Sequence, residues 1–158
     1  MKNRKKGFTI VELVIVIAVI AILAAVLIPN LSRLVGKANE SARLQEVESA
    51  LKVMLMSQED GTLDETTFVI QDGTTYYVYA YKDGKLGKEE EKTAFTKPTD
   101  SVEVKDGATQ LEIGSEKYTI EQVEGLGSVT VYLTKNDALA FDGATEVTTE
   151  STTTTTTP

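Results

Sequence analysis

The sequence predicts an α+β protein in which one long N-terminal helix packs on a small antiparallel β-sheet head. Three observations predict this fold class. No polar side chain occurs from Leu13 to Ile28, which gives a helix whose first half can span a membrane. Apolar residues then recur at helical spacing as far as Leu55. Short β-rich runs separated by turn signals make up most of the remaining chain.

We expect four segments along the 158-residue chain. They are a basic leader at 1–7, a long helix at 8–57, a globular β-rich head at 58–146 and a disordered Thr-rich tail at 147–158. Residues 8–32 of the helix are the membrane-spanning and assembly part, and residues 33–57 are amphipathic. The first part rises ~37 Å, enough to cross a hydrocarbon core of about 30 Å. The basic leader residues all precede the apolar run, which predicts a cytoplasmic N-terminus and a head outside.

Glu12 is the one charged residue at the start of the apolar run, and the next charge is Arg33. Placing a carboxylate in lipid costs ~2.5–3.5 kcal/mol on insertion scales, and less near the interface. An acid in this position is therefore a functional candidate, provided that a partner for it can be named.

The segment from Gly7 to Leu13 reads Gly-Phe-Thr-Ile-Val-Glu-Leu and follows a short basic leader. It resembles the N-terminus of type IV pilins and the related pseudopilins, whose signature is a leader ending in Gly, then Phe-Thr-(Ile/Leu)-(Val/Ile)-Glu and an apolar helix. The resemblance implies a pilin-like fold. It also implies that a prepilin peptidase cuts between Gly7 and Phe8 and methylates the new terminal amine of Phe8.

Such a cut supplies a partner for Glu12. The new ammonium on Phe8 lies at about the membrane depth of Glu12, so the Glu12 of one copy can meet the Phe8 amine of the next. Each charge then loses its desolvation penalty only on assembly, which makes the pair a register device. The same two groups are four residues apart and could instead pair within one copy.

Two other interpretations of the N-terminus compete with the pilin-type one. A secretory signal peptide also joins a basic region to an apolar one, but this apolar run is longer and Glu12 interrupts its start. A plain single-pass anchor explains the length and the orientation, and leaves the Gly-Phe-Thr-Ile-Val-Glu sequence without a reason.

Composition narrows the function. The formal net charge is −8, and loss of the four basic leader residues makes it −12, which argues against a direct nucleic-acid site. There is no cysteine or histidine and no nucleophile–base arrangement, so we expect neither an enzyme nor a cofactor. Asp106, Asp137 and Asp142 offer oxygen ligands without the spacing of a calcium loop, and we expect no metal.

Pro29 and Gly36 interrupt the helix pattern just past the apolar run. Proline inside a helix removes one backbone hydrogen bond and clashes with the preceding turn. We predict a bend at Pro29 and a second soft point at Gly36, which would allow the stem to stretch if the helix unwinds there. Filaments of the resembled family are often partly unwound in this region, and a simple kink is the alternative.

Two apolar stripes follow on the helix, out of phase by about half a turn. The first stripe is Leu31, Leu34, Val35, Ala38 and Ala42, and the second is Leu44, Val47, Ala50, Leu51, Met54 and Leu55. We expect the second stripe to pack under the head's own sheet and the first to face neighbouring subunits.

The head is predicted to be one antiparallel sheet of four to six strands. The β-rich runs are 66–70, 74–82, 102–105, 110–113, 117–123 and 128–134. Asp72-Gly73 and Asp83-Gly84 are hairpin signals. Alternation in the second run puts Tyr77, Tyr79 and Tyr81 on one face, as core packing rather than a ligand platform. The charge-rich segment 84–100 lacks a strong period and is predicted to be an exposed loop.

The resemblance implies a prepilin that is polymerised into a type IV pilus-like surface fibre. Its partners would be a prepilin peptidase, an assembly platform with its ATPase, the membrane and other pilin subunits. The alternative within the family is a pseudopilin of type II secretion or DNA uptake. An anchored surface protein that never polymerises is the alternative of a different class. The Thr-rich tail is expected to be a plain spacer, with O-glycosylation as the other possibility.

Overall fold

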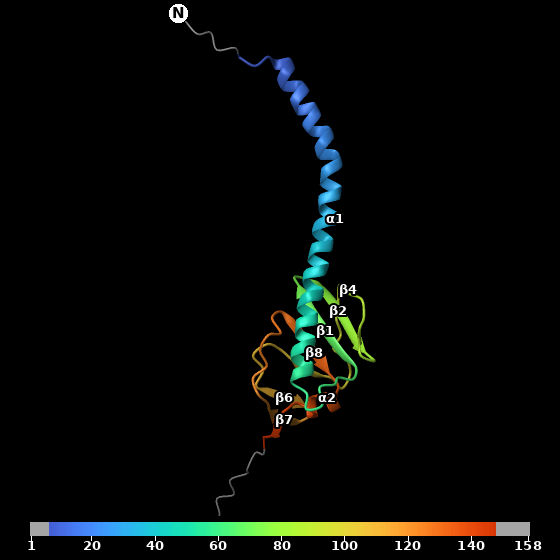
Figure 1. The fold of residues 1–158 in the computed structure, drawn as a ribbon, viewed down its shortest axis with the longest axis vertical. Coiled ribbons are helices and arrows are strands. Elements are labelled where there is room, and N and C mark those ends of the chain that lie inside the picture. The colour runs from blue at the N-terminus through green and yellow to red at the C-terminus, as the bar shows by residue number, and fades with distance from the viewer. Residues whose placement is uncertain (1–6, 148–158) are drawn as a thin grey trace, which may run out of the picture. The chain divides into compact units, whose positions relative to one another are not determined.

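The computed structural model describes residues 7–147 (Figure 1). The expected leader up to residue 6 and the Thr-rich tail from residue 148 lie outside the described residues. The chain divides after Ser41 into two compact units. We call residues 7–41 the stem and residues 42–147 the head, and each is described by itself.

Helix α1 runs from Ile10 to Met56 and confirms the long N-terminal helix of the predicted fold class. It is long and apolar enough to cross a membrane, and its most apolar window is not buried by the rest of the chain. The helix is unbroken at Pro29 and at Gly36. Near the proline, Asn30 Nδ2 donates to Val26 O at 3.2 Å. This bond goes to the carbonyl next to Ala25 O, which is the acceptor that Pro29, having no N–H, leaves without its helical donor.

The main sheet of the head is antiparallel throughout. Its strands are β1 (Thr66–Asp72), β2 (Thr75–Lys82), β3 (Lys85–Leu86), β4 (Glu90–Lys92), β5 (Val102–Val104) and β8 (Val129–Leu133). Their order is β3-β2-β1-β8-β5, and β4 also pairs with β2. The β2–β3 hairpin turns at Asp83-Gly84 as predicted, with positive φ at both residues. Figure 1 shows the second half of α1 lying across this sheet.

A second, smaller sheet corrects the prediction of a single one. It contains β6 (Gln110–Ile113), β7 (Glu116–Thr119) and β9 (Thr145–Glu146), in the order β6-β7-β9. The predicted strand 117–123 ends at Thr119. Beyond it, Ile120 and Val123 are buried in the core and still bond to the backbone of residues 107–109. A short helix α2 (Lys135–Leu139), which the pattern did not indicate, follows β8.

The segment 84–100, predicted to be an exposed loop, contains two short strands. Strands β3 and β4 both pair with β2, and the side chain of Glu89 is only 14% exposed. Glu89 is held by Arg43 of α1, 46 positions earlier in the chain.

The core of the head lies between the end of α1 and the main sheet. Val47, Ala50 and Met54 of the second stripe are completely buried, which confirms the face predicted for this part of the helix. Leu44 of the same stripe is 38% exposed and lies at its edge. Tyr79 is buried in the core, as expected for one member of the tyrosine row.

The two methionines near the end of α1 test this packing. Met54 is 0% exposed and Met56 is 82% exposed. We expect Met54→Ala to lower the free energy of unfolding by about 2–5 kcal/mol, because it leaves a cavity in the core. Met56→Ala should change it by less than about 0.5 kcal/mol. Urea titration of the full chain in detergent, followed by tyrosine circular dichroism, measures both. Equal losses for the two variants would contradict the assigned face.

Asp137 tests how the C-terminal part of the head is held. Its buried carboxylate accepts from Asp64 N at 3.0 Å and from Thr134 Oγ1 at 2.9 Å. We expect Asp137→Ala to cost about 1–3 kcal/mol, because both donors lose their acceptor. The matched control is Asp142→Ala, an exposed acid in the same region. Thermal melts measure the unfolding midpoint of each variant. Equal decreases in the midpoint for Asp137→Ala and Asp142→Ala would show that the Asp137 bonds contribute nothing specific.

Candidate functional site: the N-terminal junction and the stem

The predicted processing residues, Gly7 and Phe8, lie just before α1 begins. Both are exposed, and Phe8 keeps 84% of its surface accessible. A Cβ placed on Gly7 would meet no heavy atom within 4 Å. The fold therefore gives no packing reason for a glycine at position 7, and the junction is open to a partner.

Glu12 lies in the first turn of α1 and is bound to Thr9. Thr9 N donates to Glu12 Oε2 at 2.9 Å, and Thr9 Oγ1 donates to the same oxygen at 2.8 Å. In return, Glu12 N donates to Thr9 Oγ1 at 3.2 Å. Leu13 N donates to Thr9 O, the first bond of the helix ladder, so Thr9 is the N-cap residue. This reciprocal pair is a capping box.

Within one copy, the Phe8 amine was the predicted alternative partner of Glu12, and the structure shows Glu12 bound to Thr9. The signal was present, because Thr-Ile-Val-Glu has the Thr-x-x-Glu spacing of a capping box. Among the described residues, both bonds to the carboxylate end on Oε2 and come from Thr9. The other oxygen, Oε1, can still accept from a second donor.

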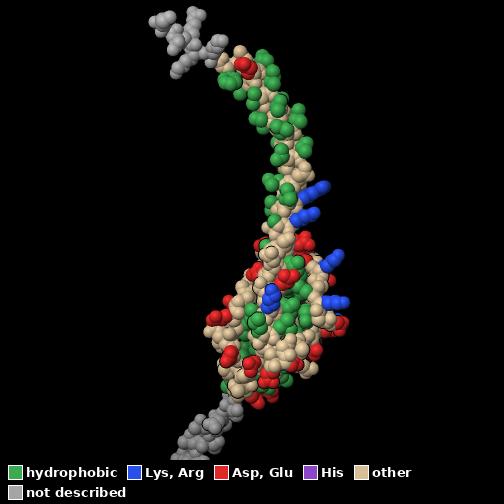
Figure 2. Space-filling model, viewed as in Figure 1, with side chains coloured by type: hydrophobic (Ala, Val, Ile, Leu, Met, Phe, Trp, Pro, Cys, Tyr) green, Lys and Arg blue, Asp and Glu red, His purple; other side chains and the backbone are tan. Residues whose placement is uncertain are grey.

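Apolar side chains cover the face of the stem that Figure 2 shows. From Ile10 to Ile28 its large apolar residues are 47–82% exposed. A continuous apolar surface of this size is far larger than a soluble monomer leaves open, and marks contact with lipid or with other apolar chains. The basic residues of the stem, Arg33 and Lys37, follow the apolar run.

The predicted bend residues lie in regular helix. Pro29 is inside α1, and a Cβ on Gly36 would meet nothing within 4 Å. A glycine inside a helix costs about 1 kcal/mol relative to alanine. No contact within the chain explains Gly36, which leaves bending or the approach of another chain as reasons for it.

Two of the three acids with oxygen ligands, Asp106 and Asp137, accept hydrogen bonds from backbone amides. Asp106 Oδ1 accepts from Gly125 N and Leu126 N, both at 2.8 Å. Asp137 Oδ1 accepts from Asp64 N, and Asp137 N donates to Oγ1 of Thr134, the N-cap residue of α2. Within residues 7–147, no group of three or more metal-ligating side chains comes together.

Comparison with known proteins gives a family for the N-terminal region. Residues 2–28 match the family model of the prokaryotic N-terminal methylation motif. The type IV wide pilus major component PilA4 of Thermus thermophilus is 52% identical over 60 residues, 38% of this chain and 45% of the relative. A type IV major fimbrial protein FimA of Dichelobacter nodosus is 36% identical over 64 residues, 39% of this chain and 41% of the relative.

The chain thus spans less than half the length of these curated relatives. No solved structure matches it. The motif match includes the Gly-Phe junction, the capping box and most of the apolar run, which are the features described above. The methylation motif and the curated relatives together show that this chain carries the prepilin signature of type IV pilins.

Proposed function

We propose that this protein is a prepilin, a structural subunit that is cleaved after Gly7, N-methylated at Phe8 and polymerised into a type IV pilus-like surface fibre. The observation that carries the proposal is the methylation motif at the head of a helix whose apolar side chains have no cover in their own chain. The relatives named as pilus and fimbrial subunits support it.

The apolar stem gives the physical reason for two states. Before cleavage the stem lies in the cytoplasmic membrane, with the N-terminus inside and the head outside. Transfer to a fibre requires an equally apolar environment, because moving one buried leucine-sized side chain into water costs about 1.5–3 kcal/mol. Other copies of the same stem provide that environment. The fibre core is therefore a bundle of stems, and the head faces outward.

The capping box adds a role for Thr9 in this scheme. In the precursor, Thr9 satisfies Oε2 of Glu12 and fixes the carboxylate at the start of the helix. After cleavage the Phe8 ammonium of a neighbouring copy binds at Oε1. The two groups then neutralise each other in an apolar surrounding, so only the correct axial register avoids an unpaired charge.

Processing and assembly of the subunit need partner proteins. A prepilin peptidase recognises the junction, and an assembly platform driven by a cytoplasmic ATPase moves subunits from the membrane into the fibre. Pro29 and Gly36 are the bend points of the stem. The protein is structural and not an enzyme.

Processing is tested by mass. Fibres are sheared from cells and pelleted. The mass of the N-terminal peptide of this chain is then measured by mass spectrometry. We expect a peptide that begins at Phe8 and carries one added methyl group. A surface-displayed chain that retains Gly7 would contradict the proposal and favour a plain membrane anchor.

Assembly is tested by substituting three residues one at a time: Glu12, its capping partner Thr9 and the exposed Glu40. Glu12→Ala should abolish incorporation into fibres and leave membrane insertion intact, because the Phe8 amine loses its partner. Thr9→Ala should reduce incorporation less, because it removes a cap worth about 1 kcal/mol and leaves the carboxylate. Glu40→Ala, an exposed acid beyond the apolar run, is the control.

Immunoblots of sheared fibres and of membrane fractions measure both pools. Normal fibres from Glu12→Ala would refute the role assigned to the carboxylate. Loss of the variant from the membrane fraction as well would show a defect in insertion and would also count against that role.

A further inference from the structure

The segment from Gly87 to Pro98, which we call the strap, lies along β2 with little burial of its own. None of its side chains belongs to the buried core, and nine of its twelve residues are exposed. Its strand β4 pairs with β2 over three residues only, Tyr76↔Lys92, Tyr77↔Glu91 and Val78↔Glu90. Phe95 adds a ring contact with Tyr132 at 5.2 Å between centroids.

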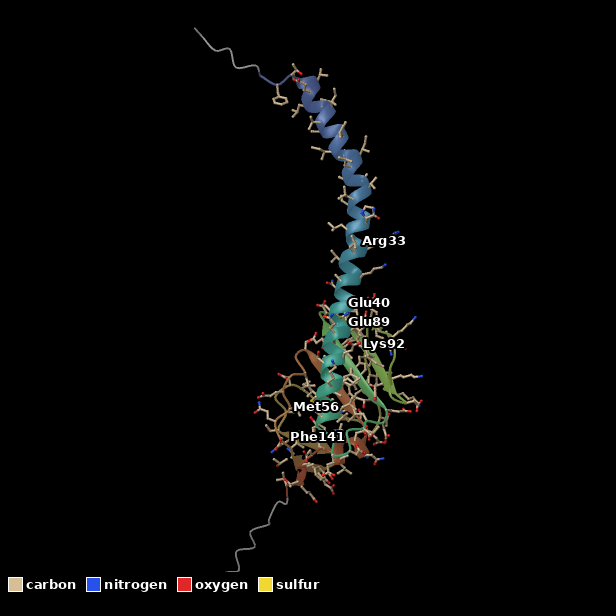
Figure 3. The ribbon with its side chains drawn as sticks, in the orientation of Figure 1. Arg33, Glu40, Met56, Glu89, Lys92 and Phe141 are labelled. Carbon is tan, nitrogen blue, oxygen red and sulfur yellow. The ribbon has the colours of Figure 1, made fainter. Side chains whose placement is uncertain are left out.

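One polar cluster fastens this strap to helix α1. Arg43 Nη2 donates to Glu89 Oε1 at 2.7 Å, and Arg43 Nε donates to Glu89 Oε2 at 2.9 Å. The Tyr79 hydroxyl donates to Glu89 Oε2. The Arg43 guanidinium also lies over the Tyr77 ring, 3.6 Å from its centroid. Glu89 is labelled beside α1 in Figure 3.

The burial of this cluster distinguishes it from the other ion pairs of the head. The Arg43 and Glu89 side chains are 18% and 14% exposed, whereas Lys82 and Glu65 are 62% and 65% exposed. Exposed pairs are screened by solvent and contribute little. A planar, two-point arginine–carboxylate pair out of solvent is among the stronger polar contacts. The hydrogen bonds from Arg43 lower the pKa of the Glu89 carboxyl, so the group stays ionised near neutral pH.

The position of Arg43 in the chain matters as much as the strength of its ion pair with Glu89. It is the second residue of the head, in the turn of α1 that comes before the first fully buried residue, Val47. The same side chain therefore holds this turn of the helix and, through Glu89, the strap. By linkage, loosening either one weakens the other by the same free energy.

We propose that the strap opens as a unit separate from the rest of the head, and that the Arg43–Glu89–Tyr79 cluster is the latch that couples its opening to the adjoining turn of α1. Opening frees the edge of β2 from Tyr76 to Val78, whose backbone groups are then available to another strand. The latch goes beyond the proposed function, since it operates in one copy whether or not the chain polymerises.

Amide hydrogen exchange of the full chain in detergent micelles, read by mass spectrometry, tests the latch. Glu89→Gln keeps the size of the side chain and removes its charge. We expect exchange of peptides covering residues 87–92 and 43–46 to accelerate about tenfold or more, because charge-assisted hydrogen bonds are lost. Peptides covering Phe68 in β1 and Val131 in β8, which pair in the middle of the sheet, should be unchanged.

Two further variants separate the latch from a general loss of stability. Tyr79→Phe removes only the hydroxyl from a ring that stays buried, and should accelerate the same peptides by a smaller factor. Lys82 lies on β2, the strand that contains Tyr79. Lys82→Gln breaks its exposed pair with Glu65, and should change the exchange rate of the same peptides by less than about twofold.

Either of two results would overturn the proposal. If Glu89→Gln accelerates β1 and β8 as much as the strap, then the cluster stabilises the head as a whole and no separate opening exists. If the strap peptides exchange at the wild-type rate in Glu89→Gln, then the cluster is not what fastens them. Acceleration confined to 87–92 and 43–46 supports the latch.

Discussion

Among residues 7–147, nothing covers the apolar surface of the stem, and the rest of the structure depends on that fact. A soluble protein would fold this surface against a sheet, as the head does with Val47, Ala50 and Met54. The stem instead leaves its large apolar side chains exposed on all sides of the helix. Lipid and other stems are the two environments that can cover it without a change of conformation. The proposed passage from one environment to the other would therefore need no refolding of the helix.

The first turn of the helix shows how that charge is kept in place. A helix that starts in an apolar medium leaves N–H groups without partners, and the capping box of Thr9 and Glu12 satisfies part of them within the chain. The bonds from Thr9 use one carboxylate oxygen and leave the other for a partner. The capping bonds account for the start of the helix, and the proposed pairing with the Phe8 amine of another copy would use the same carboxylate through Oε1. An amide at position 12 could also cap the helix, but it would carry no charge for that pairing.

The fold class, the long helix, the buried stripe and most strands could be predicted, because each depends on local periodicity. Contacts between distant positions could not. Nothing near Lys88-Glu89-Glu90-Glu91-Lys92 indicates which carboxylate is buried, since the answer lies in Arg43 on another element. The second sheet was missed for a similar reason, because β9 joins β7 from the far end of the head. At the candidate site, the junction and Glu12 were found from a family motif, whereas Thr9 required reading the same letters as a capping box.

The head holds its loops without any cysteine, and its acidic residues do much of this work. Glu46 of α1 accepts from Ser128 N and Ser128 Oγ. Asp106 accepts from Gly125 N and Leu126 N in the loop before β8, and Asp137 accepts from Asp64 N. Each is a charge-assisted bond to a backbone amide, stronger than a neutral one. A Cβ at Gly127, which has a positive φ, would lie 2.9 Å from Glu46 Oε1, so a larger residue there would be strained and would displace this carboxylate from Ser128. A disulfide constrains two points and ignores the loop between them, whereas these carboxylates bind the loop backbone directly. The acidity of the head is therefore partly structural, and changes that neutralise it would loosen loops as well as alter surface charge.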